Sequence, residues 1–134
     1  MNIEDLQKID TKGMYETYDN WPKIAKESIE SNPRKLNMKG IEHIIFAGMG
    51  GSGSIADVIT SILSKEDIHV TIVKGYHLPK NLKSNSLVVT ISVSGDTKEV
   101  LTILENAINT DARIAAFSSG GKMEDFCKLN NIFH

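Results

Sequence analysis

The sequence lacks most of the features that would stabilise a protein covalently, anchor it in a membrane or attract a polyanion. It has a single cysteine, Cys127, and so cannot form an internal disulfide or a site with several cysteine ligands. Its 15 basic and 17 acidic residues give a formal net charge of -2, which argues against nucleic-acid or anionic-membrane binding driven by bulk charge. No apolar run approaches the roughly 20 residues of a membrane helix. The first residues, Met1–Asp5, do not resemble a signal peptide. We therefore expect a cytoplasmic domain that contacts neither nucleic acid nor membrane.

The composition that remains is that of an ordinary folded domain. Hydrophobic residues make up 40% of the chain and charged residues 24%, both near the globular average. A length of 134 residues suits one domain with its own core. The last residues, Asn130–His134, look like a turn that leads into a further strand, so composition leaves open whether the chain is whole or a piece.

The apolar pattern predicts an N-terminal helical arm, residues 1–40, and one α/β domain, residues 41–134. From Met14 to about Ser31 apolar residues recur at three- and four-residue steps, which indicates helix. Pro22 interrupts this stripe and predicts either two short helices or one helix that begins near Trp21. Residues 1–13 are predicted to be irregular.

Short apolar runs alternate with helical patterns throughout the predicted domain. Strands are expected at 41–47, 68–73, 86–92 and 113–117, helices at about 52–63, 97–108 and 122–129, and the start of a fifth strand at 132–133. This alternation is typical of right-handed crossovers and a parallel sheet. We expect a three-layer αβα fold of the flavodoxin-like or Rossmann-like kind that breaks off in or near the fifth strand. The inward side chains of its first helix are predicted to be Ile55, Ile59, Ile62 and Leu63.

Three loops rich in glycine and hydroxyl residues follow predicted strands, and each opens a helix: 48–53, 92–97 and 118–121. The carboxyl ends of parallel strands share one edge of a sheet, where ligands of such folds bind. Glycine lets a ligand approach the backbone, and a helix N-terminus offers unpaired N–H groups and a favourable dipole. Hydroxyl groups add further donors. The loops together predict a phosphate site that needs no arginine.

A simpler interpretation of each loop is that it only caps its helix. Asp96, with Glu99 three residues later, resembles a capping box. Ser52 and Ser118 could likewise serve as caps.

A dinucleotide site is a further interpretation of the first loop. Gly48, Gly50 and Gly53 fit the pattern G-x-G-x-x-G between a strand and a helix. That pattern requires a carboxylate at the end of the second strand to bind the ribose. Lys74 occupies this position instead and could face a 2′-phosphate. A Walker A loop is excluded because Ser54 occupies the position of its lysine.

The histidines and the cysteine have less specific settings. His43 and His69 open the first two predicted strands, at the edge opposite the loops, and we interpret them as surface residues. His77 lies in a loop at the functional edge and has no assigned role. Cys127 is interpreted as a packing residue and not as a nucleophile. No set of histidine, cysteine and carboxylate residues suggests a metal site, so we expect neither metal nor cofactor.

The loop sequences resemble those of the SIS (sugar isomerase) domain family. Residues 92–97 match its phosphosugar loop, S-x-S-G-x-T. Residues 48–53, G-M-G-G-S-G, resemble the first loop of the bifunctional phosphoglucose/phosphomannose isomerases. Residues 73–79 and the arm around Trp21 and Pro22 are also similar to segments of that family, which carries two SIS domains.

The resemblance implies a set of site residues. The phosphate-binding residues would be Ser52, Ser92, Ser94 and Thr97 through their hydroxyls and Gly51, Gly53 and Gly95 through backbone N–H groups, with Gly50, Ser118, Ser119 and Gly120 lining the same cleft. No catalytic residue is expected within the chain, because the family's glutamate base and ring-opening histidine match positions beyond His134.

The implied function is the sugar-phosphate-binding half of an aldose–ketose isomerase. Such an enzyme interconverts glucose 6-phosphate or mannose 6-phosphate with fructose 6-phosphate through an enediol or enediolate, and the family implies a homodimer paired through SIS domains. The alternative is a non-catalytic SIS module that senses sugar phosphates. Regulators of that kind carry a helix-turn-helix, for which the non-basic region before the first strand holds too little helix. The dinucleotide-binding domain is a remoter alternative.

Overall fold

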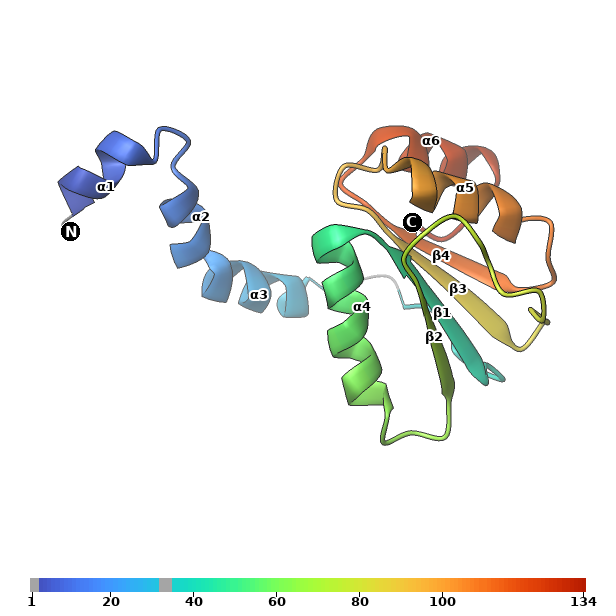
Figure 1. Ribbon diagram of the computed structural model, residues 1–134. Helices are drawn as coiled ribbons and strands as arrows, with labels where there is room; N and C mark the ends of the chain where they lie inside the picture. Colours follow the sequence, from blue (N-terminus) through green and yellow to red (C-terminus); the bar gives the residue numbers. More distant parts are fainter. Residues whose placement is uncertain (1–2, 32–34) are drawn as a thin grey trace. The chain divides into compact units, whose positions relative to one another are not determined.

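The computed structural model of the protein describes residues 3–31 and 35–134, and the chain divides into two compact units, Met1–Lys35 and Leu36–His134. The first unit contains the helices α1 (Ile3–Ile9), α2 (Met14–Asp19) and α3 (Trp21–Glu30) (Figure 1). The expectation that residues 1–13 are irregular is therefore wrong for α1. The two-helix interpretation of the following stripe is confirmed. Pro22 lies in the first turn of α3, where its missing N–H costs no helical hydrogen bond.

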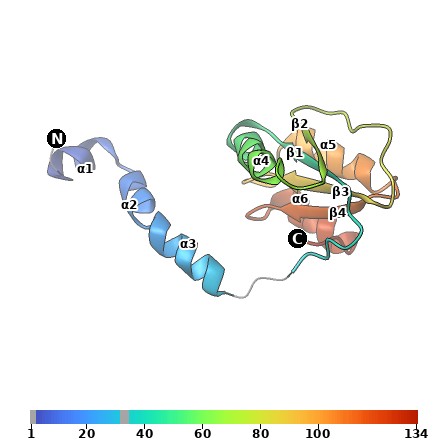
Figure 2. The ribbon, with the colours of Figure 1, turned by 90° about the horizontal axis from the view of Figure 1, so that it is seen from below.

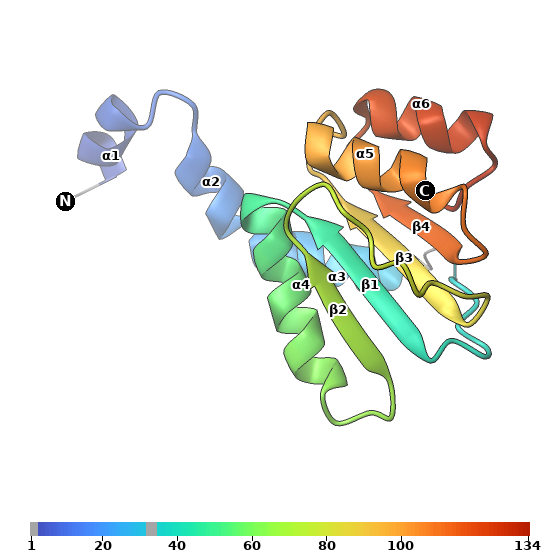
Figure 3. The ribbon, with the colours of Figure 1, turned by 45° about the vertical axis from the view of Figure 1, so that its right-hand side comes forward.

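The second unit is built on four parallel strands in the order β2-β1-β3-β4 (Figure 3). Its elements are β1 (His43–Gly48), α4 (Gly50–Leu63), β2 (His69–Val73), β3 (Ser86–Ile91), α5 (Lys98–Ala107), β4 (Arg113–Phe117) and α6 (Gly121–Leu129). Every predicted strand and helix of the domain is present, with ends shifted by one or two residues. A fifth strand begins where Phe133 forms a parallel bridge to Ala115 beside β4.

The strands are covered by helices on both faces, which confirms the three-layer αβα fold. Helix α4 packs on one face of the sheet and α5 on the other (Figure 2). One face of the sheet presents Ile44, Phe46 and Leu87 to a core that includes Ala56 of α4. The opposite face packs Ile45 and Val88 against α5. The central strands β1 and β3 are buried on both faces, as their continuous apolar runs predict.

Helix α4 presents a different face to the sheet from the one predicted. Ile55 and Ile62 are 48% and 66% exposed, and the buried residues of the helix include Ala56. Ile59 and Leu63 are partly buried against the core, as expected. The physical reason is that α4 packs on β1 and β2, and this contact buries Ala56 while the side chains of Ile55 and Ile62 stay exposed.

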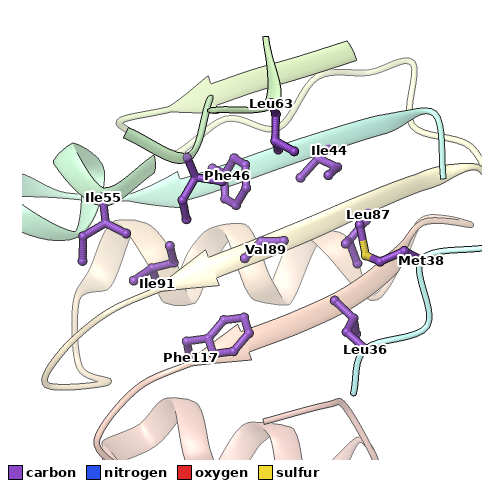
Figure 4. A pocket seen from close by; sticks show the side chains of 11 residues that line it. Leu36, Met38, Ile44, Phe46, Ile55, Leu63, Leu87, Val89, Ile91 and Phe117 are labelled. Atoms are coloured by element: carbon purple, nitrogen blue, oxygen red, sulfur yellow. The ribbon is translucent and has the colours of Figure 1, made fainter. Parts of the chain in front are cut away.

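Beside α4, the same face of the sheet forms an apolar groove of about 450 Å³ (Figure 4). Strands β1, β3 and β4, helix α4 and the segment before β1 all contribute to it. Its lining residues are Leu36, Met38, Ile44, Phe46, Ile55, Ile59, Leu63, Leu87, Val89, Ile91 and Phe117. The groove carries no polar side chain and so differs in character from the loops at the carboxyl edge of the sheet.

Candidate functional site

A second hollow lies at the carboxyl edge of the sheet, where the loops after β1 and β3 meet. Gly48 at the end of β1 is the register partner of Ile91 at the end of β3, so the two loops leave the sheet side by side. Between them is a cleft of about 560 Å³ lined by Met49, Gly51, Ser52, Ile55, Val93, Ser94 and Thr97. Helices α4 and α5 both begin at this cleft, as the sequence predicts for a phosphate site.

The first loop delivers the N-terminus of α4 to the cleft without a side-chain cap. Met49 is the N-cap, with extended backbone angles (φ −113°, ψ 151°), and its side chain makes no capping hydrogen bond. The simpler interpretation, in which Ser52 only caps this helix, is therefore wrong. Ser52 lies within the first turn of α4, is only 7% exposed and lines the cleft. The first turn thus presents N–H groups and a hydroxyl to the same hollow.

Gly48 and Gly53 are needed in this loop because the backbone segments around them pack too closely for a side chain. A Cβ on Gly53 would lie 2.9 Å from the carbonyl oxygen of Gly48, and a Cβ on Gly48 would lie 3.0 Å from the carbonyl carbon of Ser52. Two glycines let the first turn of α4 press against the end of β1. Lys74, which the dinucleotide interpretation would use, donates to the Asp57 carboxylate at 2.8 Å. Its charge is already paired within the domain.

In the second loop, one hydroxyl group is buried and stabilises the loop, and two others line the cleft. Ser92 is 2% exposed, and its Oγ accepts a hydrogen bond from the Gly95 N–H at 3.1 Å and shares another with Thr97 Oγ1 at 2.8 Å. Ser94 is exposed and accepts from the Asp96 N–H at 3.2 Å. Thr97 is the N-cap residue of α5, with no side-chain cap. Ser94 and Thr97 therefore line the cleft, whereas Ser92 holds the loop from behind.

The capping interpretations of Asp96 and Ser118 are wrong as well. Asp96 does not form a capping box on α5, because its Oδ1 accepts from the Lys122 N–H in the first turn of α6 at 3.2 Å. The N-cap of α6 is Gly120, not Ser118. The Ser118 hydroxyl instead donates to the Gly120 carbonyl at 2.8 Å, within its own turn.

The third loop supports the second from behind. The Ser119 N–H donates to the Val93 carbonyl at 3.0 Å, and the Met123 N–H donates to the Gly95 carbonyl at 3.0 Å. At Gly95, where φ is +72°, an added Cβ would overlap the carbonyl oxygen of Gly120. The backbones of the two loops are in direct contact, which fixes the shape of the second loop.

The structure thus separates the residues that the sequence proposes for the site into two groups. Those that line the cleft are Gly51, Ser52, Ser94 and Thr97; those that are absent from its lining are Gly50, Gly53, Ser92, Gly95, Ser118, Ser119 and Gly120. Met49, Ile55 and Val93 line it as well, and sequence reasoning did not name them. Met49 and Val93 lie within the two glycine and hydroxyl loops, and Ile55 follows the first loop by two residues. Their closeness to these motifs is the signal that could have identified them.

The residues that line this cleft carry no charged side chain, and its positive potential comes from backbone dipoles. None of its lining residues is ionisable, so the positive ends of the α4 and α5 dipoles supply its attraction for anions. His77 is exposed in its loop, and His134 Nε2 lies 2.7 Å from the Ser118 hydroxyl. Within residues 3–31 and 35–134 no group of three or more histidine, cysteine or acidic side chains could hold a metal ion.

Cys127 is a packing residue, as predicted. It is 1% exposed in a cluster with Val100, Leu104 and Met123, and burial raises the pKa of its thiol. A raised thiol pKa lowers the fraction of reactive thiolate. Among the described helices none is long and apolar enough to cross a membrane.

Comparison with known proteins defines the class of this chain. The SIS domain model matches residues 38–124, and the chain therefore belongs to the SIS domain family. A structural neighbour is the sugar isomerase domain of an RpiR transcription factor from Sphaerobacter thermophilus, with a TM-score of 0.54 and 18% identity, over 84% of this chain and 63% of that one. At this identity the likeness concerns the fold.

Two curated relatives are more specific. The bifunctional phosphoglucose/phosphomannose isomerase of Aquifex aeolicus is 30% identical over 128 residues, 94% of this chain and 36% of that protein. The enzyme of the same name from Caldicellulosiruptor bescii is 30% identical over 119 residues, 86% of this chain and 35% of that protein. The chain spans about a third of the length of these relatives. The match agrees with the loop motifs of residues 48–53 and 92–97.

Proposed function

We propose that the chain is the sugar-phosphate-binding part of a phosphoglucose/phosphomannose isomerase. Such an enzyme interconverts glucose 6-phosphate or mannose 6-phosphate with fructose 6-phosphate through an enediol or enediolate. The observation that carries the proposal is the cleft between the uncapped N-termini of α4 and α5, lined by Ser52, Ser94 and Thr97. The names of the two isomerase relatives support the reaction.

In this proposal the cleft holds the phosphate group and leaves the sugar to face outward. The phosphate oxygens accept hydrogen bonds from the hydroxyls of Ser52, Ser94 and Thr97 and from the N–H of Gly51. The backbone around Gly53 and Gly95 is held in place by the glycine contacts and by the Ser92 hydroxyl. Hydrogen bonds to an ionised acceptor are roughly twice as strong as neutral ones, so four such donors bind a phosphate without a basic side chain.

The chemical step needs a base that this cleft does not carry. Aldose–ketose interconversion removes a proton next to the carbonyl, which is general base chemistry. None of the residues that line the cleft is a carboxylate or a histidine. We therefore propose that the chain orients the substrate and that the base and the ring-opening group come from elsewhere in the complete enzyme. The 134-residue chain alone should bind a hexose phosphate weakly and not turn it over.

Isothermal titration calorimetry with glucose 6-phosphate tests the binding proposal. The double variant Ser94→Ala/Thr97→Val removes two hydrogen bonds to a charged group, each worth about 1.5–3 kcal/mol, and should weaken binding more than tenfold. The matched control Ser61→Ala/Thr102→Val deletes the same atoms at positions away from the cleft and should bind as the wild type does. Equal affinity of both double variants would contradict the proposal.

We also propose that the protein forms a homodimer in the cytoplasm. The support is the family resemblance together with an apolar ridge on α4, formed by the exposed side chains of Ile55, Val58 and Ile62, beside the apolar groove. A two-fold interface pairs the same patch of both copies, so the ridge of one copy could pack against the groove of the other. Val58→Glu should make the protein monomeric in analytical ultracentrifugation, whereas Leu129→Glu, 85% exposed on α6, should leave it dimeric. A monomeric wild type would contradict the dimer, and cell fractionation tests the compartment.

A further inference from the structure

Two histidines that are far apart in the sequence meet at the edge of the sheet opposite the phosphate loops. His43 opens β1 and His69 opens β2, and they are register partners in these neighbouring parallel strands. Their ring centroids are 4.5 Å apart and the ring planes are inclined by 49°. The sequence suggests two separate surface residues, but strand register makes them a pair.

The two rings are directed at one point. His43 Nε2 lies 2.8 Å from Thr71 Oγ1, and His69 Nε2 lies 3.4 Å from the same oxygen. Thr71 follows His69 by two residues and so lies on the same face of β2. A hydroxyl has one proton and can donate it to only one of the two nitrogens. The arrangement therefore places the Nε2 atoms of both rings around a single small polar group.

We propose that His43 and His69 form a two-imidazole site for a divalent first-row transition-metal ion. Imidazole nitrogen suits Ni²⁺, Cu²⁺ and Zn²⁺, and affinity in this group rises to a maximum at Cu²⁺. The ion takes one Nε2 from each ring in place of the hydrogen bonds to Thr71, and water completes its coordination. Among the described residues no third histidine, cysteine or carboxylate joins the pair. The Glu42 carboxylate, next in sequence to His43, accepts instead from Asn85 Nδ2 at 2.6 Å.

The pair is open to solvent and joins two neighbouring strands. His69 is exposed and His43 is half-buried, so an ion from solvent can reach both nitrogens. Because the ion would join β1 to β2, the outer strand of the described sheet, its binding should stabilise the domain against unfolding.

The test is a titration of the untagged 134-residue chain with NiCl₂, followed by calorimetry and by NMR. One ion should bind per chain, raise the melting temperature and broaden the imidazole proton signals of His43 and His69 selectively. His43→Asn and His69→Asn should each weaken binding at least tenfold and abolish the rise in melting temperature. The control His77→Asn removes an exposed histidine outside the pair and should change neither result.

Several results would overturn the site. They are no detectable binding, binding that survives both substitutions, or equal loss of binding in His77→Asn. The NMR readout uses the wild-type chain, so it stays decisive even where a variant folds poorly. Broadening that is spread evenly over all four histidines would mark an adventitious ion only and contradict the proposal.

Discussion

Replacing Gly95 by alanine should break the contact between the second and third loops. The new Cβ would overlap the carbonyl oxygen of Gly120 and lie 2.8 Å from its carbonyl carbon. Both atoms belong to the backbone, so no side chain can rotate away, and the 118–121 turn must move. Gly95 also has a φ of +72°, a left-handed conformation that costs a residue with a Cβ about 1–2 kcal/mol.

The steric part of this substitution adds a cost typical of overpacking, about 1–3 kcal/mol. Together the two effects should lower the free energy of unfolding by about 2–5 kcal/mol, a large part of the roughly 5–15 kcal/mol available to a domain. For a unit of this size the melting temperature should fall by at least about 8 °C. Thermal unfolding followed by circular dichroism measures this change.

The matched control is Gly75→Ala. Gly75 lies in the loop after β2, has no positive φ, and a Cβ there would meet nothing within 4 Å. Alanine at such a position should be neutral or stabilise by about 0.4–1 kcal/mol through the unfolded chain. For a domain of this size, 1 kcal/mol corresponds to about 4–8 °C in melting temperature. A melting temperature of Gly95→Ala within about 1–2 °C of that of the control would therefore refute the reasoning about the loop contact.

Three further substitutions test other parts of the account. Thr90 Oγ1 is buried without a hydrogen-bond partner in the described chain, so Thr90→Val should raise the free energy of unfolding by about 1 kcal/mol in urea denaturation; a loss would show that the hydroxyl is satisfied. Asp96→Ala removes the acceptor for the Lys122 N–H and should cost about 0.5–2 kcal/mol in the same assay, whereas no change would mean that this bond adds nothing. In metal-free buffer the lowered pKa of His43 means that the unfolded chain binds more protons below about pH 6.5, so stability should rise with pH up to that value and level off above it. His43→Asn should flatten that slope, and an unchanged slope would contradict the assignment.

Sequence reasoning located the strands and helices of the domain because each had a strong local signal. The continuous apolar runs at β1 and β3 identify buried strands, and the glycine and hydroxyl loops mark their carboxyl ends. The resemblance of these loops to the SIS family adds the site hydroxyls: Ser52, Ser94 and Thr97 line the cleft, whereas Ser92 does not. The short helix α1 was missed, because seven residues carry too little periodicity to stand out from an irregular segment.

The remaining differences depend on contacts between elements distant in the chain. A hydrophobic stripe does not say which strands α4 covers, so Ile55 and Ile62 were wrongly placed inward. The carboxylate of Asp96 reaches the next helix instead of its own, a choice that only the tertiary fold decides. The pairing of His43 with His69 follows from strand register, which the sequence leaves open.

The central claim is that the cleft between α4 and α5 binds the phosphate of a hexose phosphate. The most direct test is an NMR titration of the ¹⁵N-labelled chain with glucose 6-phosphate, with glucose as the control that lacks phosphate. Saturable shifts should centre on the amides of Gly51, Ser52, Ser94 and Thr97, and glucose should leave these signals in place. Shifts confined to residues that line the apolar groove, such as Val89 and Phe117, or no shifts at all, would contradict the account.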